Sequence, residues 1–241
     1  MARIIKPLYD IEYNGVKASS LGAHPVSRPG IPSPEENVSV ISVPGRDGVL
    51  IQKDGSYGTV VLEVTLAFSA RADAWMEKCR GLREWLLSAG NGILRLGDDS
   101  GYFYRVKRVI VGTAARTDRL VGELPVQFLC DGFSYLDAGT EEYSLYEVAV
   151  NPYALCHPVY KVTASVDGTF RIWVNGHEMS AAVGQNLTID TDRMMAYRED
   201  GTLMNTSVSG DYEGLYLRPG TNTFQTISGF TVRVIPNWRR L

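Results

Sequence analysis

Residues 59–88 read TVVLEVTLAFSARADAWMEKCRGLREWLLS, and this stretch decides the fold of the first half of the chain. Apolar side chains alternate with polar ones over residues 60–68, and a period of two predicts a strand with one packed face. After Ser69 the apolar residues instead recur every three or four positions, which predicts an amphipathic helix over residues 70–88 capped by that serine. A helix with such an apolar stripe must cover a sheet face, so we expect a first domain of the α+β type.

A hairpin and a further strand continue this domain. Gly90 is expected to end the helix, and residues 93–111 form two β-rich runs around a polar turn at residues 97–101. Alternation returns over residues 124–130. We therefore expect the first domain to span residues 1–136.

The segment ahead of the strand is rich in proline. Residues 14–36 read NGVKASSLGAHPVSRPGIPSPEE, and their four prolines predict an extended backbone without helix. Such a segment is either a loop or an arm laid on a neighbouring chain. A short β-rich run follows at residues 38–43 and ends in the turn VPGRDG, which contains Arg46 and Asp47.

The second half of the chain shows only β patterns. Residues 137–151 form an acidic connector, in which residues 143–150 are suited to pair as a strand, and a second domain follows over residues 152–241. Asn-Gly, Asp-Gly and Pro-Gly pairs separate short apolar runs there, so we expect a β-sandwich of about 85 residues. The expected strands cover residues 160–166, 169–174, 187–190, 194–197, 215–217, 223–226 and 230–235.

Composition and charge exclude several classes of protein. The 241 residues are 44% hydrophobic and 21% charged with a net charge of -3, which is typical of a soluble globular protein with two domains. Residues 1–136 hold 16 basic and 15 acidic residues, and residues 137–241 hold 8 and 12. Neither half has the basic excess of a duplex-binding domain, although a polyanion can pass such a surface without being gripped.

The cysteines and the apolar runs bear on the compartment. Three cysteines cannot all pair, and an odd, sparse count fits a reducing compartment. The first residues, MARIIKPLYD, lack the apolar core of a cleaved signal, and no run approaches the ~20 apolar residues of a membrane helix. We expect synthesis in a cytoplasm and no membrane partner.

Residue types that carry catalysis or bind metals are sparse. Cys156, His157 and His177 match no zinc spacing, so a buried cysteine and two surface histidines are the better interpretation. The pair Asp98–Asp99 lies in a predicted turn, and Asp190 with Asp192 in IDTD is better explained by a solvated turn than by calcium. Nucleophile elbows, phosphate loops and dinucleotide fingerprints are missing. We expect no catalytic residue, no cofactor and no metal, and hence no enzyme.

Aromatic residues offer a second kind of site. Trp173, Tyr197, Tyr212 and Trp238 are suited to form a sugar-stacking surface, because β-sandwiches often bind glycans through aromatic faces. Aromatic residues also suit the core of any sandwich, which is the more common place for them. Trp173 and Tyr212 are the candidate sugar contacts.

The order of these pieces resembles the distal tail protein of long-tailed siphophages, often shortened to Dit. The resemblance covers nearly the whole chain, and it rests on fragments that follow one another in the same order. They are VPGRDG (43–48), VVLEVTLAF (60–68), the helix at 71–86, LRLGDDSGYFYRV (94–106), VQFLCDGFSYL (126–136), the proline-led strand after Asn151, FRIWVNG (170–176), NLTID (186–190), LYLRPGTNTF (215–224) and IPNWR (235–239).

This resemblance implies a mainly β fold and a structural role. A belt domain with a β-sandwich, one helix and a β-hairpin is followed by a galectin-like β-sandwich. The resemblance further implies that six copies form a homohexameric ring at the distal end of a long non-contractile tail, in a virion assembled in the bacterial host. Such a ring is expected to join the tail tube protein to the baseplate or tip proteins, with tape measure protein and DNA passing its channel without sequence-specific binding.

The family also suggests where subunits meet. Residues 14–36 are a candidate contact with a neighbouring subunit or with the tube, and Arg46 and Asp47 form either an inter-subunit contact or a plain turn. The second domain is short and has no inserted carbohydrate-binding module, which makes direct host contact by this copy less expected. The alternative functions are a carbohydrate-binding module for attachment to the host cell wall and, third, a wall hydrolase.

Overall fold

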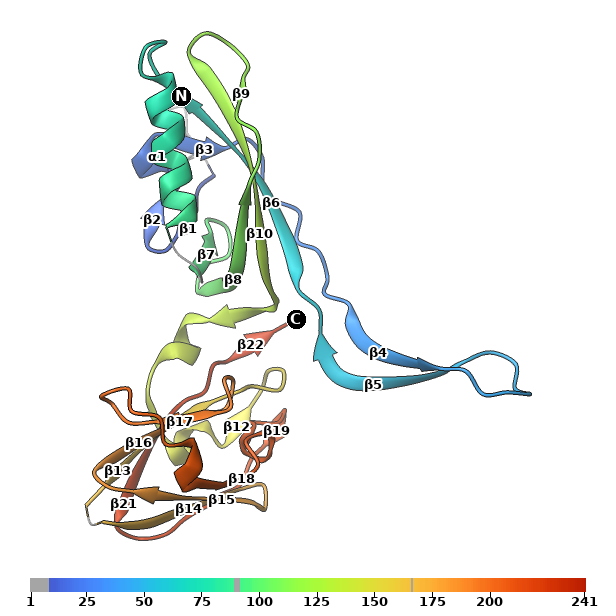
Figure 1. The fold of residues 1–241 in the computed structure, drawn as a ribbon, viewed down its shortest axis with the longest axis vertical. Coiled ribbons are helices and arrows are strands. Elements are labelled where there is room, and N and C mark those ends of the chain that lie inside the picture. The colour runs from blue at the N-terminus through green and yellow to red at the C-terminus, as the bar shows by residue number, and fades with distance from the viewer. Residues whose placement is uncertain (1–8, 89–91, 166) are drawn as a thin grey trace, which may run out of the picture. The chain divides into compact units, whose positions relative to one another are not determined.

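The computed structural model describes residues 9–88, 92–165 and 167–241. The protein is mainly β, with one α-helix among the described residues, which confirms the expected fold class. The chain divides into two compact units, residues 1–134 with Leu241 and residues 135–240 (Figure 1). The finer domain limits, with a connector at residues 137–151, stay a prediction. Among the described residues, no helix has the length and apolar character of a membrane span.

An antiparallel sheet forms the frame of the first unit. Its strands follow the order β2-β1-β7-β8-β10-β6-β3, and β9 pairs with β10 beside this path. The bounds are β1 Ile11–Tyr13, β2 Val16–Lys17, β3 Ala23–Pro25, β6 Val60–Ser69, β7 Gly92–Leu96, β8 Tyr102–Val111, β9 Ala115–Arg116 and β10 Val121–Leu136. The expected strand at residues 60–68 and the expected hairpin at 93–111 are therefore present.

The helix α1 (Trp75–Leu87) covers the apolar face of this sheet. Its buried side chains share one core with alternate residues of β6 and β10, in accord with the helical and strand periodicities of the sequence. This core contains Trp75, Cys79, Leu82 and Leu86 of α1, Val60, Leu62, Val64, Leu66 and Phe68 of β6, and Leu124, Val126, Phe128 and Cys130 of β10. Burial of each large aliphatic or aromatic side chain contributes about 1.5–3 kcal/mol.

The helix begins five residues later than the sequence predicts. Ser69 is not its cap but the last residue of β6, where it pairs with Val121, and the Ala70 amide donates to the Leu120 carbonyl. Pairing with β10 therefore keeps the chain extended past the serine, and α1 starts after Ala74 without a side-chain cap. The expected stop at Gly90 lies outside the described residues.

Pro125 interrupts the pairing on the other side of β10. A proline has no amide hydrogen to donate, so a neighbouring strand cannot continue regular pairing across it. The structure shows β8 ending at Val111, after which the Gly112 amide donates to the Pro125 carbonyl at 2.8 Å. Gly112 is needed here because a Cβ at this position would lie 2.9 Å from Cγ of the proline. Pairing resumes only with β9, opposite Gly122 and Glu123.

The proline-rich segment is more structured than expected. β1 and β2 form a hairpin, a single 3-10 turn covers Ala18–Leu21, and β3 adds to the edge of β6. The prediction that residues 14–36 hold no helix is thus wrong over this one turn, which precedes the first proline. Prolines follow it, and residues 26–35 belong to no strand, although the Val26 amide still donates to the Thr65 carbonyl of β6 at 2.8 Å.

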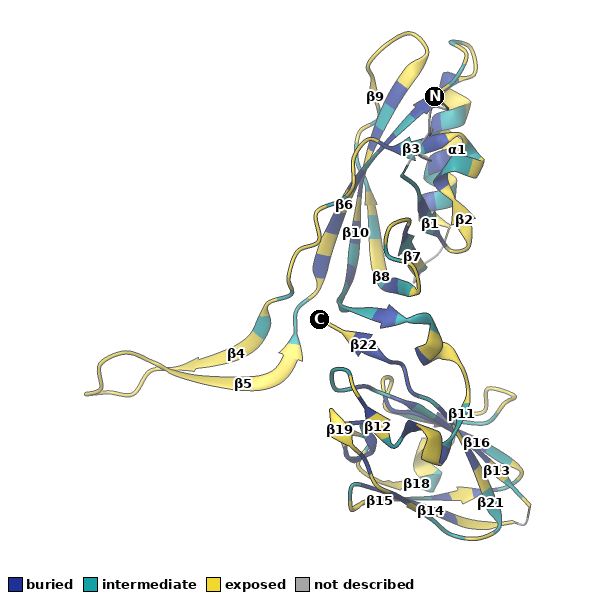
Figure 2. Ribbon diagram, turned by 180° about the vertical axis from the view of Figure 1, so that it is seen from behind, coloured by how far each residue is buried: buried dark blue, intermediate teal, exposed yellow. Residues whose placement is uncertain are grey.

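A separate two-stranded ribbon follows the prolines. It consists of β4 (Glu36–Ile41) and β5 (Leu50–Tyr57). The sequence predicts β4 but not β5, because LIQKDGSY is largely polar and carries a glycine. Figure 2 shows both strands mostly in the colour of exposed residues, with one half-buried residue at the root of each.

The second unit is a sandwich of two antiparallel sheets. One has the order β11-β21-β13-β16-β17 and the other the order β18-β15-β14-β20, with their inner faces in one core. A small pair, β12 with β19, and the final strand β22 complete it. The bounds are β11 Tyr143–Ser144, β12 Val150–Asn151, β13 Val159–Ala164, β14 Gly168–Val174, β15 His177–Val183, β16 Asn186–Asp190, β17 Met195–Tyr197, β18 Val208–Gly210, β19 Gly220–Thr221, β20 Phe224–Thr226, β21 Phe230–Ile235 and β22 Arg239–Arg240.

Two expected strands of this unit are each shortened by a single 3-10 turn. The run 143–150 pairs only at its two ends, in β11 and at Val150 of β12, because Ser144 and Glu147 form a capping box that starts the turn Leu145–Val148 between them. The run 215–217 follows the turn Glu213–Leu215 and makes only an isolated bridge from Leu217 to Cys156. A further 3-10 turn covers Asn205–Ser207, and β15 is a strand that the sequence does not predict.

Candidate inter-subunit arm

The ribbon β4–β5, called the arm below, presents aliphatic side chains to solvent on both faces. Cross-strand pairing of Val40 with Ile51 and of Ile41 with Leu50 fixes the register. Since neighbouring residues of a strand point to opposite faces, the first pair lies on one face and the second on the other. Val40 and Ile51 are each 63% exposed, and every residue from 37 to 56 is exposed.

Polar contacts hold the root of the arm. Lys53 forms an ion pair with Glu36 at 2.6 Å, and the Asn37 amide donates to the Ser56 hydroxyl at 2.7 Å. The Asp54 carboxylate accepts hydrogen bonds from the backbone amide and hydroxyl of Ser56, which lowers the pKa of that carboxyl. The aliphatic pairs Val40–Ile51 and Ile41–Leu50 lie nearer the turn, while Val38 pairs with Lys53 at the root.

A two-stranded ribbon with both faces exposed is suited to bind another protein chain. An isolated two-stranded hairpin is at best marginally stable in water, and its outer edges carry backbone amide and carbonyl groups that pair readily with another strand. Covering either face of the arm removes aliphatic surface from water. The arm is therefore the part of the described chain best suited to contact another protein.

Arg46 and Asp47 lie in the turn of the arm. Both residues are exposed, and the Arg46 amide donates to the Val43 carbonyl at 3.2 Å within the turn. The structure thus places this candidate pair at the end of the arm, where a neighbouring subunit can reach it. A contact between subunits at this position stays a prediction.

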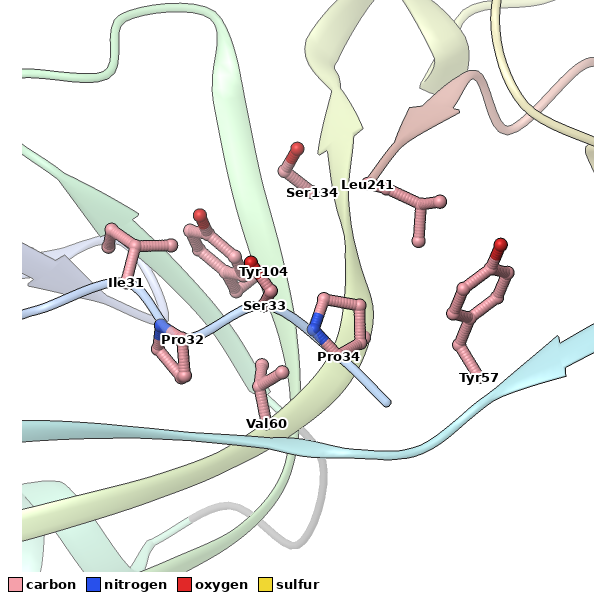
Figure 3. A pocket seen from close by; sticks show the side chains of 10 residues that line it. Ile31, Pro32, Ser33, Pro34, Tyr57, Val60, Tyr104, Ser134 and Leu241 are labelled. Atoms are coloured by element: carbon pink, nitrogen blue, oxygen red, sulfur yellow. The ribbon is translucent and has the colours of Figure 1, made fainter. Parts of the chain in front are cut away.

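A pocket of about 420 Å³ lies in the first unit at the root of the arm (Figure 3). Figure 3 shows Ile31, Pro32 and Pro34 along one side, with the rings of Tyr57 and Tyr104 facing the hollow. Val60, Ser33, Gly132, Ser134 and Leu241 complete the lining. Its prolines, aliphatic groups and hydroxyls suit packing or hydrogen bonding, and its lining contains no His, Asp or Glu side chain that would activate a serine hydroxyl.

The cysteines are buried and poorly suited to chemistry. Cys79, Cys130 and Cys156 are all free thiols in the two cores. Burial raises the pKa of Cys130 to about 12 and also raises that of Cys156, so both stay protonated at neutral pH. No group of three His, Cys, Asp or Glu residues with metal-binding geometry occurs in the described ranges.

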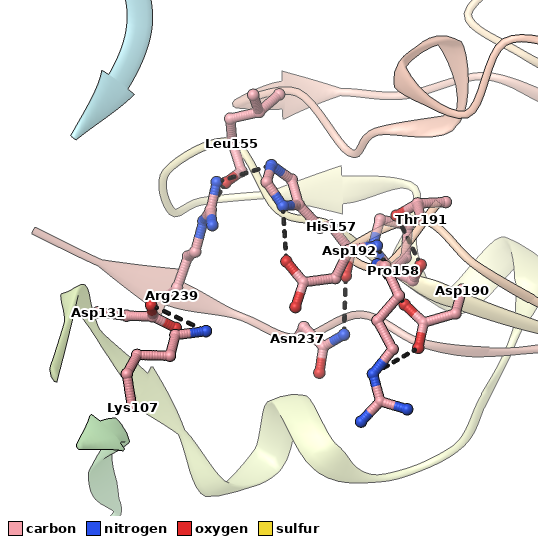
Figure 4. A network of polar contacts seen from close by, with 11 residues as sticks. Lys107, Asp131, Leu155, His157, Pro158, Asp190, Thr191, Asp192, Asn237 and Arg239 are labelled. Carbon is pink, nitrogen blue, oxygen red and sulfur yellow. Dashed lines mark hydrogen bonds and ion pairs between the residues drawn. The ribbon is translucent and has the colours of Figure 1, made fainter. Parts of the chain in front are cut away.

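His157 belongs to a polar network in the second unit rather than to an open surface (Figure 4). Its Nδ1 lies 3.0 Å from Asp192 Oδ1 and its Nε2 lies 3.0 Å from Nη2 of Arg239, while the ring stacks on Tyr216. A guanidinium only donates, so Nε2 accepts and the ring proton sits on Nδ1, facing the carboxylate. The expectation of two surface histidines therefore holds for His177, which is exposed, but is wrong for His157, which is half-buried.

The two acidic pairs that the sequence singled out lie in turns. Asp190 is buried, and its carboxylate accepts hydrogen bonds from the backbone amides of Asp192 and Arg193. Asp190 thus closes a turn as the sequence predicts, but its side chain is buried and not solvated. Asp98 pairs with Arg28 at 3.4 Å, and burial raises the pKa of Asp99.

The four aromatic residues of the suggested sugar surface do not share one environment. Trp238 is buried in the second core, where it packs against Tyr153, so it is not part of an exposed surface. Trp173 is half-buried on β14, and Tyr212 packs against the core with its hydroxyl shielded from solvent. Sugar contact by Trp173 or Tyr212 stays a prediction.

Comparison with known proteins identifies the fold. No protein-family model and no curated protein matches the chain. A search of solved structures finds the Dit protein (gp19.1) of phage SPP1, a paradigm of the hub adsorption apparatus in phages that infect Gram-positive bacteria. The TM-score is 0.70 over 97% of this chain and 98% of that chain, at 14% sequence identity.

The chain has the Dit fold. The resemblance seen in the order of the sequence fragments is thereby confirmed at the level of structure. The arm is the feature of this Dit-like chain that sequence reasoning missed. Valines at alternate positions ahead of VPGRDG, followed by VLI, are the signal of a hairpin that indicates it.

Proposed function

We propose that this protein is a tail-hub subunit of a long-tailed phage, six copies of which form a ring at the distal end of the tail. The ring joins the tail tube protein to the baseplate or tip proteins. It leaves a channel through which tape measure protein and DNA pass. The protein acts in the virion as a structural connector and not as an enzyme.

The observation that carries this proposal is the match to the SPP1 hub protein along nearly the full length of both chains, together with the exposed arm. A fold alone supports many functions, so the surface must also suit the role. An arm with aliphatic residues on both faces, such as Val40 and Leu50, suits a neighbour that covers it. Contacts in which an arm of one subunit meets a different surface of the next generate closed rings when the rotation closes.

The charge distribution is also compatible with a conduit. Residues 1–136 hold 16 basic and 15 acidic residues, which leaves a balance of +1 in the part that contains the arm. Tight phosphate binding needs an excess of lysine and arginine, which releases counterions from the nucleic acid. A nearly neutral ring therefore lets DNA pass without holding it.

Native mass spectrometry and negative-stain imaging test this proposal. Six copies of the 26.6 kDa chain give a particle of about 160 kDa with a central hole, alone or on addition of the tail tube protein. Rings are expected to form more readily on the tube, because the tube end supplies a template. A chain that stays monomeric at about 100 µM with and without the tube protein contradicts the proposal.

A further inference from the structure

A polar hollow opens in the second unit between two turns. One turn joins β15 to β16, and the other follows β17 (Figure 1). The hollow has a volume of about 520 Å³. Its lining consists of Gly184, Gln185, Asn186, Arg198, Glu199 and Asp200. The lining therefore combines backbone, amide, guanidinium and carboxylate groups. None of the six lining residues is aliphatic, so apolar surface comes only from the methylene groups of the polar side chains.

Backbone hydrogen bonds hold both turns in place. The Arg198 amide donates to the Thr202 carbonyl, and the Gly201 amide donates to the Arg198 carbonyl, both at 2.9 Å. Gly201 has a φ of 85°, a conformation that favours glycine at this end of the turn. The Glu199 amide donates to Oδ1 of Asn186 at 3.0 Å and so ties one turn to the other. A site held in this way loses little freedom when a ligand binds.

Arg198 is the group in the hollow with unused hydrogen-bonding capacity. Its Nε–H is shielded from solvent and has no acceptor among the described residues. Gly184 makes room for the guanidinium, since a Cβ at that position would lie 3.2 Å from Nη2. A shielded donor without an acceptor is unfavourable, and a small rotation of the Arg198 side chain toward the hollow would let an oxygen of a ligand satisfy it.

The remaining groups decide which ligand fits. Glu199 and Asp200 beside one arginine give the lining a net charge of -1, which disfavours an anion. Hydrogen bonds from Thr202, with Arg198 nearby, lower the pKa of the Asp200 carboxyl, which keeps it an acceptor. The Oδ1 of Asn186 already accepts a hydrogen bond from Glu199, so this side chain offers a ligand only the donor groups of its Nδ2.

Donors and acceptors therefore alternate around a space that is too polar for an apolar ligand. Adjacent hydroxyls of a sugar both donate and accept, and so match a guanidinium next to a carboxylate. We propose that this hollow binds a neutral saccharide, with Arg198 donating to its oxygens and Glu199 and Asp200 accepting from its hydroxyls. The site is formed by elements other than those that carry Trp173 and Tyr212, and it does not depend on ring formation.

A titration of the full ¹⁵N-labelled chain tests this site. Galactose, glucose and mannose are added separately up to about 50 mM, and glycerol 1-phosphate serves as the anionic probe. We expect at least one sugar to shift the amide signals of residues 184–186 and 198–200. Arg198→Met is expected to weaken that dissociation constant about tenfold or more, because a hydrogen bond to a charged group is lost. Arg171→Met, an exposed arginine of β14, is the matched control.

The possible results separate clearly. No shift with any of the three sugars, or tighter binding of glycerol 1-phosphate than of the sugars, overturns the proposal. Binding that survives Arg198→Met but is lost in Trp173→Ala assigns the sugar to the aromatic face instead and also overturns it. Arg198→Lys, which keeps the charge but not the planar fork, is expected to weaken binding as well and replaces Arg198→Met if that variant fails to fold.

Discussion

The arm offers the sharpest test of assembly, through the double variant Val40→Lys with Ile51→Glu. The two residues pair across the strands, so opposite charges preserve an attractive cross-strand contact while removing both aliphatic side chains. Complete burial of a valine or isoleucine contributes about 1.5–3 kcal/mol. Each of these side chains is 63% exposed, so covering the pair with a neighbouring subunit contributes about 2–4 kcal/mol per interface.

Loss of that contribution raises the dissociation constant of each interface at least about 30-fold. Sedimentation velocity between about 1 and 100 µM, with and without the tail tube protein, measures the shift from rings to monomers. The free energy of unfolding of the monomer is expected to stay within about 0.5 kcal/mol of the original, because both positions are exposed. Val150→Lys, at a position in the second unit that is also 63% exposed, is the matched control and is expected to leave assembly unchanged.

Two results would refute this reasoning. Rings of unchanged mass and stability in the double variant would show that neighbouring subunits do not cover this face of the arm. A loss of more than about 1 kcal/mol in the unfolding of the monomer would show that the arm packs on its own chain.

Three further predictions concern the two cores. Gly122→Val is expected to cost about 1–3 kcal/mol in urea unfolding, because a Cβ there would lie 2.5 Å from Cζ of Phe68; an unchanged midpoint would contradict this packing. Tyr160→Phe is expected to cost about 1–3 kcal/mol by the same measurement, since the buried hydroxyl donates to the Leu215 carbonyl at 2.7 Å. Burial raises the pKa of Cys130 to about 12, against about 8.5 in an unfolded chain, so its contribution to stability is complete below about pH 8.5 and is lost as pH rises towards 12. Urea unfolding at pH 8 and pH 10.5 is expected to show a smaller loss of stability in Cys130→Ala than in the original chain, and equal losses would argue against this shift.

The sequence predicted those elements whose pattern and partners agree. The run from Val60 to Phe68 is a strand in both accounts, because its alternating apolar face is the one that packs under α1. The start of the helix was predicted wrongly, because Ser69 is a good cap in isolation but pairs with Val121 in the sheet. Strand pairing with a distant segment overrides a local preference that contributes about 1 kcal/mol.

The candidate sites were predicted less well, since they depend on contacts between segments far apart in the chain. The sequence predicts the turn that contains Arg46 and Asp47. It does not predict the ribbon on which this turn lies, because the second strand, β5, is mostly polar. His157 was expected at the surface, and only the fold brings Asp192 and Arg239 to its two ring nitrogens. Arg198 has no motif around it, and its unused donor is visible only in three dimensions.

The sequence by itself determined the mainly β class, the single amphipathic helix and the order of fragments that resembles a tail hub protein. These follow from periodicity and turn residues, which are local properties of the chain. Only the tertiary structure decided that residues 37–56 stand exposed as an arm and that a polar hollow forms around Arg198. Whether a side chain is covered depends on what the rest of the chain leaves beside it, and no local pattern carries that information.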